Sequence, residues 1–414
     1  MKKEQKKQKK QNKELYVIII IILLIALSQF NEAVYGASLP KLLGVFVTSK
    51  TFFENTLLSY FLGFAIGTIC WGYLADIFER KRILICGLTI YICSNLLSIS
   101  SNSLIFLVFF RFFQGVGCSI GSVLAQAIIR DLIPENKRYN MFNIINIVIA
   151  FVPAIGLVTG LSLMKFSKWQ SIFILLALNG LCVLSLVYFY LPRKIDNNLK
   201  EFKDSPKAKF AVFISCFQQI KKDQNVLRIG FTIGGALGVL FTTFSQITLY
   251  VESNFQVSFS HSLIISLFMS IALFIGGLIS KKMNRSPNQK IYIALKMLVI
   301  FSIIFLIIIR SELILNYYNK NLFMYLCLVI IYAILATVSI IMPNCLSQML
   351  TNYKKYPGTA ASIFGFYYYI ITLVFVCGMK FLFIYKQLSL PIFYFISALV
   401  LLLNFRTIIK LNVN

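Results

Sequence analysis

Twelve long apolar runs constrain the fold of this chain more than any other feature of its sequence. A helix crosses the hydrocarbon core of a bilayer with about 20 mostly apolar residues. The runs are continuous, whereas the strands of a membrane β-barrel alternate apolar and polar residues over about ten positions. We therefore expect an all-α membrane protein with twelve transmembrane helices in two six-helix halves. The expected spans are 16–39, 53–76, 83–101, 103–129, 140–163, 169–191, 228–251, 261–280, 289–309, 321–345, 357–379 and 389–409.

The positions of the basic residues predict how these helices are oriented. The chain carries 40 Lys and Arg against 14 Asp and Glu, a formal net charge of +26. If both termini are cytoplasmic, thirty of the 40 cations fall in cytoplasmic segments. Because cytoplasmic loops of membrane proteins are rich in Lys and Arg, we expect a multi-pass protein of the cell (inner) membrane with both termini inside. With 58% hydrophobic residues, the chain does not resemble a nucleic-acid binder, whose basic residues lie on a soluble fold.

The longest polar segment, 192–227, separates six apolar runs from six. Its middle, 210–220, has apolar positions at helical spacing and fits a helix on the membrane surface as well as it fits an ordinary solvated linker. The expected organisation is a basic tail 1–15, a first half 16–191, a linker 192–227, a second half 228–409 and a tail 410–414.

The side chains that enzymes use are scarce in this sequence. The nine cysteines lie almost entirely within apolar runs, and His261 is the single histidine. Metal and hydrolytic sites need clusters of such groups, and the glycine-rich loops that hold nucleotides are also absent. We therefore expect no enzyme, no metal and no cofactor.

A charged motif follows the second apolar run. Residues 72–82 read GYLADIFERKR, which resembles the signature loop of the major facilitator superfamily, G-x-L-a-D-r-x-G-r-k. The resemblance implies a twelve-helix transporter whose cytoplasmic gate includes this loop. In such a gate Asp76 pairs with Arg80 and faces the start of the eleventh helix, near 358–359. The gating residues expected from the motif are Gly72, Asp76, Arg80, Arg130 and Asp131.

Two further motifs point to one branch of that superfamily. Residues 111–117 read RFFQGVG, which looks like the family motif R-x-x-Q-G-x-g. Together with Tyr35 and the Leu39-Pro40 pair, this segment is similar to the bicyclomycin-resistance (Bcr/CflA) drug:proton antiporters. In the fifth run, Pro153 and Gly156 partly match the antiporter motif G-P-x-x-G-G. The resemblance implies proton-coupled efflux of small amphipathic compounds or drugs by alternating access.

Two charged residues lie inside the expected spans at matching depth. Glu32 lies seven residues before Leu39, and Arg111 lies eight residues after Ser103, which places both about 10–12 Å below the outer surface. Acidic groups inside the membrane usually serve transport, although Glu32 is near enough to the interface to snorkel. We expect Glu32 and Arg111 to share a cavity in which Glu32 exchanges a proton. The other polar residues expected in this cavity are Tyr35, Gln114, Asn143, Asn146 and Gln246.

The position of the acid differs from that in the related branch, which usually has it one residue later, where this chain has Ala33. Two other functions remain open: proton-coupled uptake or exchange of a metabolite, and a membrane sensor or scaffold that would need neither Glu32 nor Arg111. The expected partners are a small-molecule substrate, protons and the lipid bilayer, without nucleic acid, and the protein is expected to be a monomer.

Overall fold

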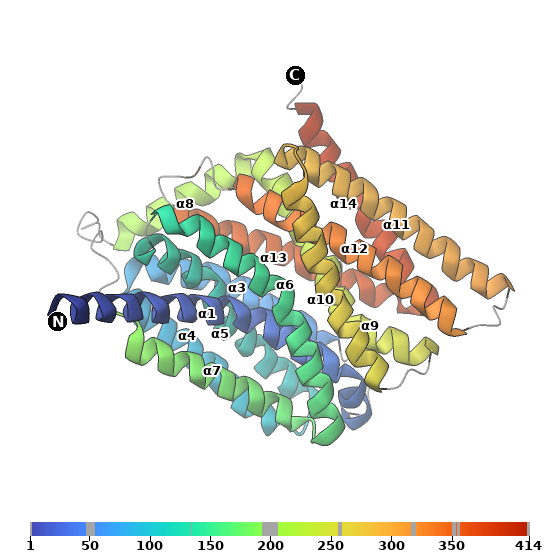
Figure 1. Cartoon of the computed structure of the whole chain (residues 1–414), viewed down its shortest axis with the longest axis horizontal. Helices are drawn as coiled ribbons and strands as arrows, with labels where there is room; N and C mark the ends of the chain where they lie inside the picture. The colour runs from blue at the N-terminus through green and yellow to red at the C-terminus, as the bar shows by residue number, and fades with distance from the viewer. Residues whose placement is uncertain are drawn as a thin grey trace.

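The computed structural model describes residues 2–46, 54–133, 135–192, 206–255, 259–315, 320–349, 353 and 357–411, and in this part of the chain the secondary structure is helical. Twelve long helices form a bundle, and a shorter helix, α8, joins the two sets of six (Figure 1). The long helices are α1 (Lys2–Phe46), α3 (Asn55–Ile77), α4 (Arg80–Ile99), α5 (Leu104–Leu132), α6 (Glu135–Phe166), α7 (Gln170–Tyr190), α9 (Gln224–Phe255), α10 (Phe259–Lys282), α11 (Pro287–Leu315), α12 (Lys320–Met349), α13 (Pro357–Leu382) and α14 (Ser389–Leu411).

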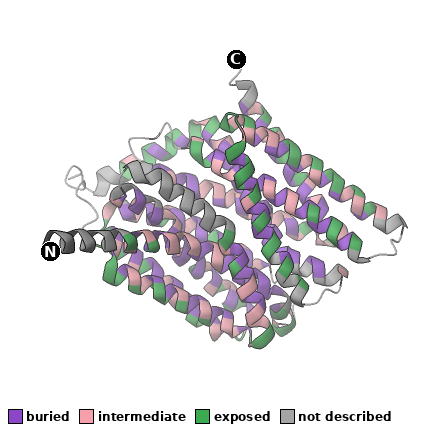
Figure 2. Ribbon diagram, in the orientation of Figure 1, coloured by how far each residue is buried: buried purple, intermediate pink, exposed green. Residues whose placement is uncertain are grey.

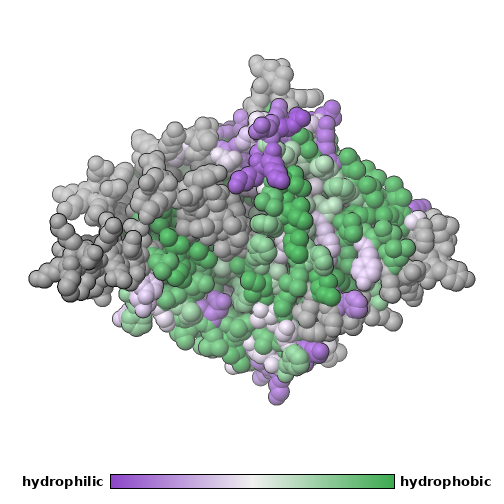
Figure 3. All heavy atoms as spheres, in the orientation of Figure 1, coloured by the Kyte–Doolittle hydropathy of each residue, from purple (hydrophilic) through white to green (hydrophobic). Residues whose placement is uncertain are grey.

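The bundle is built to lie in a membrane. The described residues contain nine segments that are long and apolar enough to cross a bilayer, and one of them, Gly358–Ile408, includes both α13 and α14. Hydrophobic side chains cover the middle of the described face, and polar residues gather at its upper and lower edges (Figure 3). Exposed residues follow the outer sides of the helices while buried residues fill the interior (Figure 2). These observations confirm the expected all-α membrane fold with twelve long helices.

The first helix is longer than expected. The sequence predicts a basic tail over 1–15, whereas α1 already begins at Lys2. The reason lies in the composition of this segment, which is rich in Lys and Gln and has no Gly or Pro to interrupt a helix. The linker also contains a helix, α8 (Pro206–Lys222), as its apolar spacing indicates.

Besides the contacts within each set of six, three helix pairs form the most extensive contacts between the sets. Helices α3 and α13 pack together, as do α6 and α10, and α1 and α9. Within the first set, α3 packs on α5, α4 on α5 and α7, and α1 on α6. The division into two domains at the linker stays a prediction.

The contact between α3 and α5 brings the two backbones together. A Cβ atom on Gly115 would collide with the carbonyl oxygen of Tyr60, and one on Gly63 would collide with that of Phe112. Only glycine allows helices to approach this closely at these points. The contact lies beside Arg111 and therefore determines where that side chain sits relative to α3.

Candidate functional site

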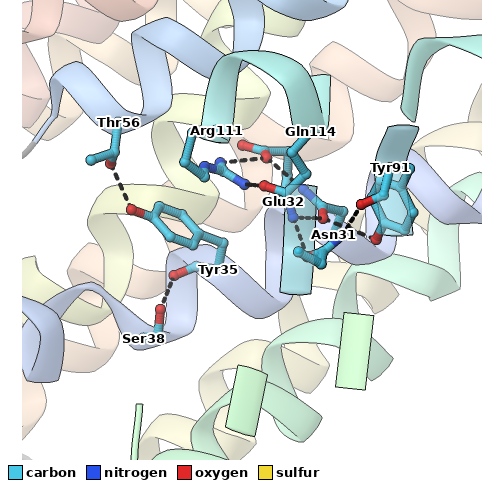
Figure 4. Close-up of polar contacts among 9 residues, drawn as sticks. Asn31, Glu32, Tyr35, Ser38, Thr56, Tyr91, Arg111 and Gln114 are labelled. Atoms are coloured by element: carbon cyan, nitrogen blue, oxygen red, sulfur yellow. Dashed lines mark hydrogen bonds and ion pairs between the residues drawn. The ribbon is translucent and has the colours of Figure 1, made fainter. Parts of the chain in front are cut away.

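A buried ion pair joins α1 to α5 in the first set of helices. Arg111 Nη2 donates a hydrogen bond to Glu32 Oε1 at 2.9 Å (Figure 4). Arg111 is fully buried, and only 6% of Glu32 is exposed. The two residues expected at matching depth therefore lie in direct contact. Glu32 does not extend to the surface as a snorkelling side chain would.

Amide side chains surround this ion pair on one side. Asn31 donates to Glu32 Oε1 at 3.0 Å, and Arg111 Nη1 donates to Gln114 Oε1 at 2.5 Å. Gln114 in turn donates to Asn31 Oδ1 at 3.0 Å. The four side chains form a closed ring of hydrogen bonds in which each charge has an amide partner.

Helix α4 completes the network. The hydroxyl of Tyr91 donates to Asn31 Oδ1 at 3.1 Å, and Gln114 donates to Asn95 Oδ1 at 2.5 Å. Asn95 itself donates to the backbone carbonyl of Tyr91 at 2.8 Å. Because buried polar groups are costly unless they are hydrogen-bonded, this set of contacts holds α1, α4 and α5 in one relative position.

Two tyrosine rings cover the guanidinium of Arg111. Its Cζ atom lies 3.8 Å from the ring centroid of Tyr35 and 4.4 Å from that of Tyr60. The Tyr35 hydroxyl donates to Thr56 Oγ1 at 2.6 Å, which holds this ring against α3. A desolvated cation over an aromatic face gains about 2 kcal/mol or more. The positive charge is therefore stabilised by more than its carboxylate partner.

The carboxyl group of Glu32 is arranged asymmetrically. Both of its hydrogen bonds, from Asn31 and Arg111, reach Oε1. Among the described residues, its other oxygen, Oε2, accepts no hydrogen bond. A proton on Oε2 would leave both contacts of Oε1 in place.

Position 33, where the resemblance in sequence leads us to expect the acid, faces a different helix. The Cβ of Ala33 lies 2.7 Å from the point where Gly156 of α6 would carry a Cβ atom. Pro153, the other residue of the antiporter-like motif, is buried in the same helix one turn earlier. Glu32 thus faces Arg111, whereas Ala33 is packed against the motif of α6 without space for a longer side chain.

One further residue predicted for the cavity, Gln246, has its hydrogen bond elsewhere. Gln246 of α9 donates to Glu54 Oε1 at 2.8 Å, in a buried contact between the two sets of helices. This hydrogen bond of Gln246 is thus made to Glu54 and not to Glu32 or Arg111. The side chains of Asn143 and Asn146 lie outside the described residues.

The predicted gating motif lies where α3 meets α13. A Cβ atom on Gly72 would collide with the side chain of Ser362, so the two helices touch at this point. Arg80 is buried at the start of α4. The side chains of Asp76, Arg130 and Asp131 lie outside the described residues, and their pairing stays a prediction.

Four side chains of the site were not predicted from the sequence, although a signal existed for three of them. Asn31 is next to Glu32, and Asn95 and Tyr91 are hydrogen-bonding residues four positions apart in a mostly apolar run. Such spacing places both on one face of a helix. Tyr60 had no such signal, because aromatic residues are common throughout the chain.

A twelve-helix membrane bundle with buried charges between its helices is the architecture of a secondary transporter. The family model described as "Major Facilitator Superfamily" matches residues 21–376, and the chain belongs to this family of transporters, which are not enzymes.

Relatives and solved structures agree with this assignment. An uncharacterized transporter of Rickettsia felis is 29% identical over 352 residues, covering 83% of this chain and 84% of the relative. A bicyclomycin resistance protein homolog of Haemophilus influenzae is 28% identical over 190 residues, covering 45% of this chain and 46% of that protein. The crystal structure of a D-xylose-proton symporter is similar in fold, with a TM-score of 0.71 at 14% identity, over 94% of this chain and 97% of that one.

Proposed function

We propose that this chain exports small amphipathic compounds in exchange for protons, and that Glu32 carries the proton. The buried contact between Glu32 and Arg111 is the observation on which the proposal rests. Ionisable residues within a membrane bundle are rare and are usually functional. A structural role alone would be served as well by apolar residues of similar volume, since a buried ion pair adds little net stability.

The surroundings of Arg111 support a cycle of proton uptake and release. When Glu32 takes up a proton, its attraction for the guanidinium is weakened. The rings of Tyr35 and Tyr60 and the carbonyl of Gln114 then continue to stabilise the positive charge. Glu32 can therefore alternate between charged and neutral forms without leaving Arg111 unsupported in a low-dielectric interior.

Helix α3 connects the protonation site to the second set of helices. Tyr60 covers Arg111, while Phe61, one residue later, packs on Phe241 of α9 with ring centroids 4.9 Å apart. One turn later, Phe64 packs on Tyr369 of α13 at 4.4 Å. We infer that a movement of Tyr60 alters these two contacts and thereby biases which face of the bundle is open.

Export of amphipathic compounds is favoured by the motifs of the first half. The RFFQGVG segment and the Pro153–Gly156 segment resemble those of drug:proton antiporters, and a relative that matches part of this chain is named for bicyclomycin resistance. The structure adds that Gly156 contacts α1 at Ala33, beside the proposed proton carrier. The antiporter-like motif and Glu32 thus belong to one packed unit.

Proteoliposomes with the pH-sensitive dye pyranine inside and ethidium as the transported probe test the proposal. With an imposed pH gradient, we expect ethidium movement and an opposite flow of protons for the natural protein. Glu32→Gln should abolish the coupled proton flow. Glu201→Gln, the same chemical change in the linker, should leave it intact. Full coupling in the Glu32→Gln variant would refute the proton-carrier role, and ethidium movement in the direction of the protons would refute export.

A further inference from the structure

Helix α8 lies at the ends of membrane-spanning helices from both halves of the chain. It packs against α3 and α13. Tyr73 of α3 contacts it through Phe210 and Phe213, with ring centroids 6.1 and 5.5 Å away. Because Tyr73 is in the last turns of α3, which ends at Ile77, α8 lies at the level where the bundle leaves the hydrocarbon core.

The apolar surface of α8 is wider than the bundle covers. Cys216 and Ile220 are buried against the bundle. Phe210, Ile214 and Phe217 are 52%, 39% and 40% exposed, and their spacing of four and three residues places them on one stripe. Figure 1 shows α8 along the edge of the bundle. This stripe of three residues is called the α8 stripe below.

The charges of α8 are of one sign. The sequence of this helix, PKAKFAVFISCFQQIKK, has lysines at 207, 209, 221 and 222 and contains no Asp or Glu. The exposed apolar stripe is thus flanked at both ends by positive charge. Large exposed apolar side chains bordered by lysines are typical of helices that lie in the interface of an anionic membrane.

We infer that α8 is a membrane-interface helix whose stripe inserts into the adjoining leaflet and whose lysines bind anionic lipid headgroups. Two observations favour lipid over a protein partner: the positive charge of α8 and the position of its stripe relative to the membrane surface. An anionic leaflet matches the lysines, and the apolar stripe lies at the height where headgroups give way to acyl chains. The uncovered half of the apolar surface is then shielded from water as fully as the covered half.

This lipid contact acts on the meeting point of α3 and α13. In addition to the contact with Tyr73 of α3, a second contact links the end of α8 to the start of α13. Asp223, the residue after α8, accepts a hydrogen bond on Oδ2 at 3.2 Å from the hydroxyl of Tyr353, just before α13. Asp223 also caps the start of α9 by accepting from the backbone of Val226 at 3.2 Å. Anionic lipid that holds α8 in the interface therefore stabilises the arrangement in which Gly72 of α3 packs against Ser362 of α13.

The test uses the full-length protein in nanodiscs and does not depend on transport, so it succeeds or fails separately from the proposed function. Phe217→Trp places a fluorophore on the stripe, and Gln218→Trp places the matched one on the polar side of the same helix, also exposed. The signal of the two native tryptophans is subtracted with the parent protein. Lipids brominated on their acyl chains should quench the Phe217→Trp signal by about half or more and the Gln218→Trp signal far less. Ile214→Trp repeats the measurement if Phe217→Trp does not fold.

Lipid charge provides the second arm of the test. Quenching at position 217 should be stronger in nanodiscs that contain phosphatidylglycerol than in pure phosphatidylcholine. Replacing Lys221 and Lys222 by Gln should reduce that preference by about fivefold per lysine. Equal quenching at positions 217 and 218 would overturn the inference. So would concentration-dependent dimers in which the stripe is shielded from brominated lipid, because the occupant would then be a second copy of the chain.

Discussion

Removing either partner of the buried ion pair should have unequal effects on stability. Glu32→Gln leaves the guanidinium of Arg111 buried without its carboxylate, and arginine cannot release its proton in a protein. Arg111→Gln leaves Glu32 buried, but a carboxyl group can take up a proton and become neutral. Glu32→Gln should lower the free energy of unfolding by about 3–5 kcal/mol, less the stabilisation that the two tyrosine rings give to the guanidinium. Arg111→Gln should cost less at low pH.

The pH dependence of the two variants separates these cases. In Arg111→Gln, the folded protein holds a proton on Glu32 that the unfolded chain releases as the pH rises. Stability should therefore fall with rising pH, by at most about 1.4 kcal/mol per pH unit. Glu32→Gln has no titratable group at this site, so the site should add no pH dependence to the stability of that variant between about pH 5 and pH 8.

Thermal unfolding in detergent, followed with a thiol-reactive dye, can measure these differences because Cys118 and Cys345 are buried and become reactive only on unfolding. The double variant with Gln at both positions should be more stable than Glu32→Gln alone, since no buried charge remains. Tyr91→Phe is a matched control that removes a hydrogen bond from the network but no charge, and it should lower the free energy of unfolding by about 1 kcal/mol. Equal, pH-independent losses for the two single variants would refute the reasoning.

Two further changes test the packing around the site. Gly115→Ala should destabilise the protein by about 1–3 kcal/mol, because the new methyl group would collide with the backbone of Tyr60. Gly277→Ala is the control: a Cβ atom at position 277 would have no neighbour within 4 Å, so this change should be neutral or stabilising in the same unfolding assay. Gln246→Leu removes a hydrogen bond to the buried carboxyl of Glu54 and should weaken the contact between the two sets of helices by about 1.5–3 kcal/mol. Spin-label distances between α3 and α9 should then broaden, and unchanged distances would show that this bond does not hold the halves together.

The helices could be predicted from the sequence because the hydrocarbon core imposes a length and a polarity on each span. Their ends were less predictable. The run at 228–251 corresponds to α9, which extends from Gln224 to Phe255, since a helix continues past the membrane wherever polar residues permit it. The same cause explains why α1 includes the basic segment expected to be a tail.

The ion pair illustrates how far a sequence can locate a site. Residue counting gave the depth of Glu32 and Arg111, because the rise per residue of a helix is fixed. It could not give the direction in which each side chain points, which depends on how the helices pack. Gln246, which is also polar and intramembrane, was predicted for the same cavity, and counting could not predict its hydrogen bond to Glu54, just before α3. Direction also distinguishes Glu32 from Ala33, which face different helices.

The backbone contact between α3 and α5 has a mechanical consequence for the whole transporter. Gly63 meets Phe112 and Gly115 meets Tyr60, so both contacts lie within the turn of α5 that follows Arg111. Neither helix can slide or turn against the other without a collision of main-chain atoms. Under the mechanism proposed above, protonation of Glu32 can move side chains between the helices, but it can move the backbones of α3 and α5 only by tilting the two helices together. The two helices then move as one rigid unit, and α3 transmits that movement to α13, against which it packs.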